Sequence, residues 1–334
     1  IRNLELLHSA NANAKTLIDI IDKTSSPMGS RLMRRWLSLP LKNREQIMSR
    51  YEIVDFFVNN NEHISNFQDS IRQVGDLERL ISKVSLLRVN PRELLQVARA
   101  LDHIENIKNL CAESNNDALK LYAEQLNVCD SIRQRIKRTL NPDSPAVISK
   151  GNIINEGVDE QLDNLRTLSR SGKDYLTDIQ RREVAATGIS SLKIGYNNVF
   201  GYYLEVTNLH KDKVPAEWIR KQTLANAERY ITEELKEYEQ KILGADEKIQ
   251  AIEEQLYLEL INACGEFVAP IQLAASLIAK IDCLVSFAHV AVKNNYVMPT
   301  IDDSYVIDIK EGRHPVIEQM MPVGEQYISN DIYL

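Results

Sequence analysis

The stretch SLKIGYNNVFGYYLEV, residues 191–206, interrupts a chain in which most other segments have the periodicity of helices. On both sides of Asn197 and Asn198, apolar residues occur at every second position, as in β-strands that bury one face. The alternating residues are Leu192, Ile194 and Tyr196 before this pair, and Tyr202, Leu204 and Val206 after it. The alternation predicts two strands joined at a turn, and the flanking segments determine the rest of the fold.

Two long helical segments flank this hairpin. In residues 158–186 the apolar stripe has a period of 3.6, and it ends near Gly188. After Pro215 we expect extended or mixed structure up to about Tyr230, where a second helix begins. Its apolar residues recur at intervals of seven, with a second set at the alternate heptad position: Leu235, Ile242, Ile249 and Leu256, with Tyr238, Ala245 and Ile252.

A heptad seam needs a partner helix, and residues 158–186 provide one of comparable length. We therefore predict two antiparallel arms with a small sheet at their end. At about 1.5 Å per residue, such an arm would hold the tip roughly 40 Å from the body. A sheet this small gains little stability from its own burial, so its position predicts that it contacts another molecule.

The first 140 residues contain repeated helix-start signals. Caps are predicted in SSP (25–27), NREQ (43–46) and NPRE (90–93), each followed by apolar residues at helical spacing. This pattern is typical of an all-α domain with short loops. After Pro142 the helices stop, and short apolar pairs within 147–154 predict a small hairpin or turn.

The composition of the 334 residues, with 12 Gly, 10 Pro and 6% aromatic residues, favours long helices over a sandwich or barrel. The four cysteines form no CxxC pair, so we expect reduced, buried thiols instead of a zinc site or disulfides. The apolar stretch 267–292 is interrupted by charged and polar residues, which predicts a buried helix and no membrane span. The sequence begins with Ile1, and we expect it to be part of a longer cytoplasmic protein.

The predicted tip is the locally positive part of an acidic chain. The formal net charge of the whole sequence is -7, whereas residues 186–230 contain six lysines and arginines against four acids. Basic side chains interleaved with amides, beside backbone N–H groups near Gly195 and Gly201, suit phosphate oxygens. A solvated hairpin with ordinary surface lysines is the alternative. The second basic run, RQRIKR at 133–138, is interpreted as a solvated helix face.

Six segments resemble the MutS family of DNA mismatch repair proteins, in the family's order along the whole chain. They are TSSPMGSRLMRRWLSLPL, RQVGDLERL, NEGVDEQLDNLR, LKIGYNNVFGYYLEVTN, RKQTLANAERYITEELKEYE and EGRHPVIE. The resemblance implies a mainly α fold: a helical core, long antiparallel lever helices and a small β-sheet clamp at the tip. Residues 1–155 would form the first part of the core and lever, 156–249 the clamp with its arms and a β tip at about 188–230, 250–298 the returning helices, and 299–334 the start of an ATPase domain.

The resemblance also implies a set of residues that bind the DNA backbone. We expect these to be Lys193, Asn197, Asn198 and Asn226, to which charge and position add Arg220, Lys221 and Gln222. The position before Asn226, commonly basic in the family, is Ala225 here, which reduces the expected contacts.

The family's ATPase domain contains a phosphate-binding loop of the form GxxxxGK[ST], which does not occur in this sequence. Tyr327, in the segment EQYISND, matches an aromatic that stacks on adenine, so the resemblance implies a partial nucleotide site. His314 has no partner that would make it catalytic, and no catalytic or metal-binding cluster is recognisable. We therefore expect this chain to be non-enzymatic and without a cofactor, with ATP and Mg²⁺ bound by the full-length protein.

By resemblance, the chain would hold duplex DNA through sequence-independent contacts and couple the ATPase state to opening of the clamp. The implied partners are double-stranded DNA containing a mismatch, a second copy of the protein and a MutL-type repair protein, in the cytoplasm and associated with the nucleoid. Two alternatives stay open. The tip could bind an acidic protein as a coiled-coil scaffold, with Tyr202, Tyr203 and Trp218 as anchors, or the chain could be a MutS homologue that serves recombination.

Overall fold

The computed structural model describes residues 5–9, 11, 14–197, 199, 201–322 and 324–334. Its contacts divide the chain into two compact units, residues 1–137 with 261–334 (the helical unit) and residues 138–260 (the arm unit). The predicted mainly α fold with a small antiparallel sheet is confirmed. The domain boundaries implied by the family resemblance stay predictions.

Helices dominate the helical unit. They are α1 (Leu17–Ile21), α2 (Pro27–Ser38), α3 (Arg44–Asn59), α4 (Glu62–Val74), α5 (Leu77–Ser85), α6 (Pro91–Glu113), α7 (Asp117–Gln125), most of α8 (Asp130–Thr139), α11 (Val268–Asn294) and α12 (Pro315–Met320). The caps predicted at Ser26, Asn43 and Asn90 are confirmed, since each side chain accepts a hydrogen bond from a backbone N–H of the first turn. A two-stranded sheet of β5 (Asp308–Gly312) and β6 (Asn330–Tyr333) completes this unit.

The core of the helical unit forms around α11, which packs against α2, α3, α4 and α5. Within the described residues, α11 alone is long and apolar enough to span a bilayer, yet 61% of its most apolar window is buried inside the protein. It therefore serves here as the predicted buried helix. The carboxylate of Asp282, fully buried in α11, accepts hydrogen bonds from the backbone N–H of Ser25 (2.8 Å) and from the N–H and hydroxyl of Ser26 (2.9 and 2.7 Å). This ties the start of α2 to the core helix.

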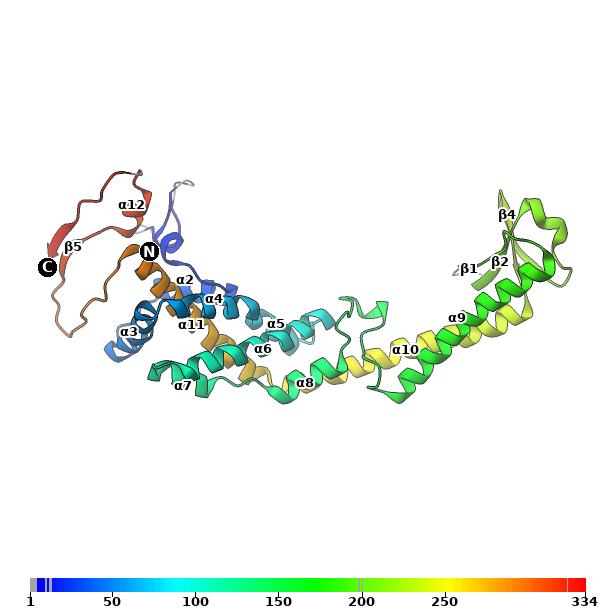
Figure 1. Cartoon of the computed structure of the whole chain (residues 1–334), viewed down its shortest axis with the longest axis horizontal. Helices are drawn as coiled ribbons and strands as arrows, with labels where there is room; N and C mark the ends of the chain where they lie inside the picture. Colours follow the sequence, from blue (N-terminus) through cyan, green and yellow to red (C-terminus); the bar gives the residue numbers. More distant parts are fainter. Residues whose placement is uncertain (1–4, 10, 12–13, 198, 200, 323) are drawn as a thin grey trace. The chain divides into compact units, whose positions relative to one another are not determined.

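The arm unit contains a pair of long helices, α9 (Glu160–Thr187) and most of α10 (Glu233–Gly265). The last residues of α10, from Ile261 on, are assigned to the helical unit. The two helices run antiparallel, as Figure 1 shows. Buried Leu176 and Ile179 of α9 pack against buried Leu235 and Ile242 of α10. Thus the prediction that the two arms pair is confirmed within this unit.

The heptad pattern predicts the inner face of α10 only as far as Ala245. Beyond that point Ile252 and Leu256 are half-exposed, while Glu253 and Tyr257 are buried. A straight α-helix has 3.6 residues per turn, so a strict seven-residue repeat drifts around the helix surface. A buried carboxylate, Glu253, thus lies on the inner face where the heptad pattern predicts apolar residues, and the prediction that Ile252 and Leu256 face the partner helix stays a prediction.

The connection from α8 to α9 differs from the predicted hairpin at 147–154. Ile148–Lys150 forms a single turn of 3₁₀ helix, η1, and Ile154 pairs with Leu140 instead of with the apolar pair at 147–148. The left-handed backbone of Gly151 and Asn152 (φ 68° and 60°) reverses the chain between these segments, so the alternative prediction of a turn is the correct one.

A four-stranded antiparallel sheet lies at the end of the two arms (Figure 1), and we call this sheet with its connections the tip. The strands are β1 (Lys193–Asn197), β2 (Gly201–Thr207), β3 (Ile219–Thr223) and β4 (Ala227–Ile231), in the order β1-β2-β4-β3, with a 3₁₀ helix η2 (Asn208–Lys213) after β2. The predicted hairpin is confirmed with Ile194 opposite Leu204. The second hairpin, β3–β4, lies where the sequence indicated extended or mixed structure.

Candidate nucleic-acid interface

The sheet of the tip buries one face. Leu204, Val206 and Tyr230 of this face pack with Ile189, Leu192 and Trp218 into a small core, and Val184 at the end of α9 covers it. Because side chains alternate along a strand, the residues between these core positions point to the opposite face. That second face is the one available to a large ligand.

A row of polar residues crosses the second face from one edge of the sheet to the other. The registers place Lys193 opposite Glu205, Glu205 opposite Arg229, and Arg229 opposite Gln222. Arg229 donates to Glu205 (3.0 Å) and to the Gln222 side-chain oxygen (2.9 Å), and its guanidinium lies over the Tyr203 ring at 4.2 Å. Arg229 and Glu205 therefore neutralise one another, and Lys193, exposed on the edge strand, makes no ion pair with the described residues.

A β-bulge separates Arg220 from Gln222. The register of β3 against β4 shifts between these two residues, so Arg220 lies opposite Tyr230 on the core face while Gln222 lies on the second face. Arg220 is 61% exposed, but it contacts Glu228 at 3.2 Å. Hydrogen bonding from the Tyr230 hydroxyl, together with Arg220, holds the pKa of Glu228 below its usual range. Arg220 is thus accessible, but its charge is already paired.

Lys221 and Asn226 are the most open of the predicted residues on the β3–β4 hairpin. Lys221 lies in the bulge and is exposed, with no ion pair among the described residues. Asn226 is exposed in the turn, and its carbonyl accepts a hydrogen bond from the Asn208 N–H (3.1 Å). Ala225, also exposed there, contributes only its carbonyl, which accepts from the Asn208 amide at 2.9 Å.

Asn197 ends β1 and organises the turn that follows. Its side-chain oxygen accepts a hydrogen bond from the Val199 N–H at 2.8 Å, which leaves the amide NH₂ of this half-buried residue as a donor. Asn198 lies outside the described residues. The structure therefore brings Lys193, Asn197 and Gln222 to one face, places Lys221 and Asn226 on the β3–β4 hairpin, and separates Arg220 from them.

Four exposed lysines of the tip make no ion pair within the described part of the chain: Lys193, Lys211, Lys213 and Lys221. Both arginines of the same segment are paired with acids. Asp212 and Glu217 make no ion pair with the residues that the structure describes, so the excess of two positive charges resides on lysines. Lysines without internal partners are available for an external polyanion.

Comparison with known proteins agrees with this geometry. The family described as MutS domain III matches residues 1–288. Over all 334 residues the chain is 57% identical to the DNA mismatch repair protein MutS of Flavobacterium psychrophilum and 54% identical to that of Bacteroides fragilis. It covers 39% of the length of each.

This chain belongs to the MutS family.

Tyr327, the residue of this MutS-family chain that the resemblance assigns to nucleotide binding, lies between α12 and β6 in the helical unit and is half-exposed. His314 caps α12, because its Nδ1 accepts hydrogen bonds from the backbone N–H groups of Val316 and Ile317 at 3.3 Å. This agrees with a structural role for the histidine. Among the described residues, no group of three or more His, Cys, Asp or Glu side chains could hold a metal ion.

Part of the basic run 133–138 is paired with acids. Arg133, with a side chain only 7% exposed, contacts Glu105 at 2.5 Å and Asp130 at 2.6 Å. Lys137 contacts Asp102 at 2.6 Å. The interpretation of this run as a solvated helix face is wrong for Arg133, whose charge is used inside the helical unit.

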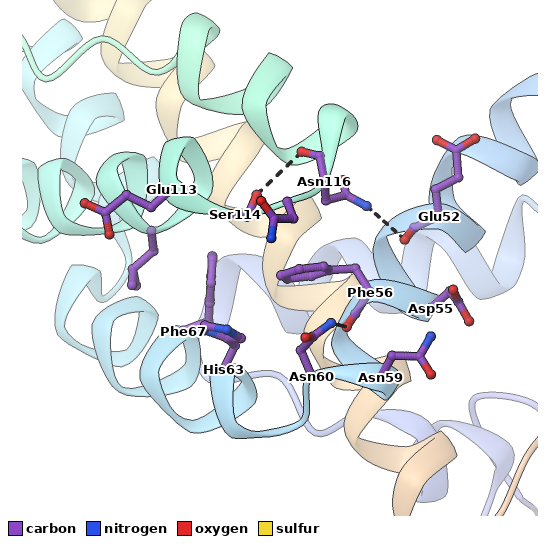
Figure 2. A pocket seen from close by; sticks show the side chains of 12 residues that line it. Glu52, Asp55, Phe56, Asn59, Asn60, His63, Phe67, Glu113, Ser114 and Asn116 are labelled. Carbon is purple, nitrogen blue, oxygen red and sulfur yellow. Dashed lines mark hydrogen bonds between the residues drawn. The ribbon is translucent and has the colours of Figure 1, made fainter.

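A polar pocket of about 480 Å³ lies in the helical unit between α3, α4 and the α6–α7 connection. Figure 2 shows Glu52, Asp55 and Glu113 around the ring of Phe56, with the Asn116 amide donating to the carbonyl of Glu52 at 3.1 Å. Neither lysine nor arginine is among the residues that line it. Three carboxylates repel phosphate, so the lining of this pocket does not favour DNA.

Sequence reasoning missed the residues that organise the tip. Glu205, Arg229 and Glu228 looked like ordinary surface charges, because their pairings form only when strands pair: Glu205 with Arg229 between β2 and β4, and Glu228 with Arg220 within the β3–β4 hairpin. The alternation of Glu205 with apolar residues in β2 was a signal for its place on the second face. Glu239 of α10, whose carboxylate contacts the β1–β2 hairpin, had no such signal.

Proposed function

We propose that this chain is the helical core and DNA clamp of a MutS-type mismatch repair protein, and that its tip holds duplex DNA by the sugar-phosphate backbone. The observation that carries the proposal is the set of four exposed lysines, two on the sheet and two in η2, that make no ion pair with the described residues, beside two arginines that are already paired. A lysine is a compact point charge that attracts phosphate from many directions. Base discrimination depends on bidentate donors directed at base edges, and the tip presents no unpaired arginine among its described residues.

The proposed contacts combine charge with neutral donors. Lys193 and Lys221 would neutralise phosphates, and the amides of Asn197 and Asn226 would donate to phosphate oxygens. Because Lys193 lies on β1 and Lys221 on β3, the outer strands of the sheet, they are separated by three strand spacings, about 14 Å. Such a spread suits a phosphate backbone, where charges recur along a line.

The arms would transmit motion to this surface. Tyr175 of α9 stacks on Tyr238 of α10 at 3.9 Å, and the Ser169 hydroxyl donates to Asp246 at 2.6 Å. Packed, hydrogen-bonded helices transmit rigid-body movements. We propose that an ATPase domain of the full-length protein, with bound ATP and Mg²⁺, tilts these arms and opens or closes the tip, while this chain itself catalyses no reaction.

The same proposal includes a second copy of the protein that closes the clamp, a MutL-type partner, and a cytoplasmic, nucleoid-associated location. These rest on family membership. They extend to the full-length protein, of which this chain corresponds to 39% in the curated relatives cited above.

The test is the salt dependence of binding to a duplex of about 30 base pairs. If two or three phosphates are neutralised, log affinity falls with log salt at a slope of roughly -2 to -3. Two duplexes of unrelated sequence should give the same affinity and slope. A slope near zero, or no binding at low salt, would refute phosphate contact by the tip.

The alternative of a coiled-coil scaffold for an acidic protein loses its main support. Two of the three aromatic residues proposed as anchors, Tyr203 and Trp218, are 8% and 7% exposed and pack inside the tip. Hot spots of protein interfaces need aromatic side chains that a partner can cover. Competition between duplex DNA and polyglutamate distinguishes the two, since a site for an acidic protein would favour the peptide. A role in recombination instead of repair would appear as preference for branched over mismatched duplexes.

A further inference from the structure

The turn between β1 and β2 is held by a carboxylate from the neighbouring arm. Oε2 of Glu239, in the second turn of α10, accepts a hydrogen bond from the backbone N–H of Tyr202 at 3.1 Å. A charged acceptor makes a hydrogen bond of about 1.5–3 kcal/mol, stronger than one between neutral groups. This bond joins the end of β2 to the helix.

Gly201 makes this approach possible. Its φ of 76° lies in the left-handed region, and a Cβ built on it would lie 2.0 and 2.1 Å from the two carboxylate oxygens of Glu239. The carboxylate therefore fills the space that only a glycine leaves open. Gly201 is also the register partner of Asn197, so the group that Glu239 holds is the base of the turn after β1.

The arms fix the direction of the Glu239 side chain. Tyr238 stacks on Tyr175 of α9, and Glu234 contacts Arg182 of α9 at 2.5 Å. These two contacts set the rotation of α10 about its own axis. Because consecutive residues are about 100° apart around a helix, Tyr238 faces the partner arm while Glu239 faces the sheet.

We infer that Glu239 is a positioning residue for DNA binding: it holds the start of β2, opposite Asn197, on α10 so that the Asn197 amide meets a phosphate. The inference rests on the proposed function and identifies the place where an arm and a DNA-contacting turn are directly joined. Without this bond the turn keeps its sequence but loses its fixed orientation. Ile194 and Tyr202 would keep the hairpin packed on the arms, so the change is expected in the position of the hairpin end and not in the fold of the tip.

The charge of Glu239 makes the test sharp, because a negative group near DNA should by itself weaken binding. Removal of a merely repulsive carboxylate would strengthen binding. Glu239→Ala is instead expected to weaken duplex affinity about tenfold, the loss of one hydrogen bond to a charged group. The salt slope should stay unchanged, because the lost donors are neutral and release no counterion.

Glu239→Gln keeps an oxygen acceptor and should recover most of the affinity. Glu237→Ala is the matched control, because Glu237 is an exposed acid on the same helix. It should leave affinity unchanged or raise it. The melting temperature of each variant should stay close to that of the parent, which excludes a loss of folded protein as the cause.

Amide exchange without DNA separates this inference from the proposed function. Exchange at Tyr202 should accelerate in Glu239→Ala and stay slow in Glu237→Ala. If the parent binds DNA and Glu239→Ala binds equally well or better, the inference is overturned and the proposed function stands. If the parent does not bind, both are overturned, whatever the exchange shows.

Discussion

Removal of Arg166 from its ion pair with Glu253 should destabilise the arm unit strongly, and removal of Glu253 should destabilise it less. Arg166 of α9 contacts Glu253 of α10 at 2.6 Å, with side chains 11% and 1% exposed. Arg166 also donates to the Ile154 carbonyl at 2.8 Å, whereas Oε2 of Glu253 has no hydrogen-bond partner among the described residues. Water therefore screens this pair little. Arg166 also contacts Asp163 at 3.4 Å, whereas Glu253 pairs with Arg166 alone among the described residues.

The magnitudes follow from this burial. Arg166→Met alone leaves the buried charge of Glu253 without its partner, at a cost of about 3–5 kcal/mol, whereas Glu253→Leu leaves Arg166 with Asp163 at 3.4 Å and should cost less. The double variant buries no charge, and an apolar replacement of a buried pair is often neutral. It loses the hydrogen bond to Ile154, so we expect about 1 kcal/mol of destabilisation. The double variant should thus be more stable than either single variant.

The two tryptophans of the sequence allow the measurement. Trp218 is buried in the tip of the arm unit and Trp36 lies in the helical unit, so Trp36→Phe leaves a reporter of the arm unit alone. Urea unfolding followed by Trp218 fluorescence gives the free energies. Arg170→Met with Glu156→Leu is the control, because that pair is 69% exposed on both sides and should contribute less than about 1 kcal/mol. Single variants that lose under 1 kcal/mol, or a double variant that loses the sum of both, would refute the reasoning.

Two further predictions concern the space around two glycines and the reactivity of the buried thiols. Gly29→Ala should destabilise the helical unit by about 1–3 kcal/mol, because the added Cβ would lie 2.1 Å from Oδ2 of the buried Asp282. Gly244→Ala has no neighbouring atom within 4 Å and should stabilise its helix by about 0.5–1 kcal/mol. Urea titrations of both variants measure these changes, and equal effects of the two substitutions would contradict the prediction. The four buried thiols should resist a thiol reagent at pH 8 until the protein unfolds. Burial raises the pKa of Cys111 and Cys264 to about 12, and it also raises the pKa values of Cys129 and Cys283. Rapid labelling of the folded protein would contradict this prediction.

Local sequence patterns predicted those helices and strands that are determined by interactions between residues close in the sequence. Asn43 and Asn90 cap helices because their side chains reach N–H groups three residues ahead, which is readable from spacing. The β1–β2 hairpin was readable for the same reason, since period-two alternation reflects one buried face. The second hairpin was not, because Arg220, Lys221 and Gln222 are consecutive polar residues and a bulge between them breaks the alternation.

The interactions that organise the tip and the arms could not be read from the sequence, because they join distant segments. Glu205 meets Arg229 only once β2 and β4 pair, and Glu253 is buried only because Arg166 approaches from the other arm. A heptad pattern cannot predict such a buried carboxylate, because it predicts apolar residues on the face of α10 that packs against α9. The candidate lysines could be identified from their charge. The sequence did not show which lysines and arginines of the tip are already neutralised by acids.

The central claim is that the unpaired lysines of the tip hold DNA phosphates, and paired charge removal tests it most directly. Lys193→Gln with Lys221→Gln should make the slope of log affinity against log salt shallower by about 1.8, because each neutralised phosphate contributes about 0.9. Lys15→Gln with Lys42→Gln removes the same charge from exposed positions of the helical unit and should leave the slope unchanged. An unchanged slope in the tip variant, or an equal change in both, would contradict the account.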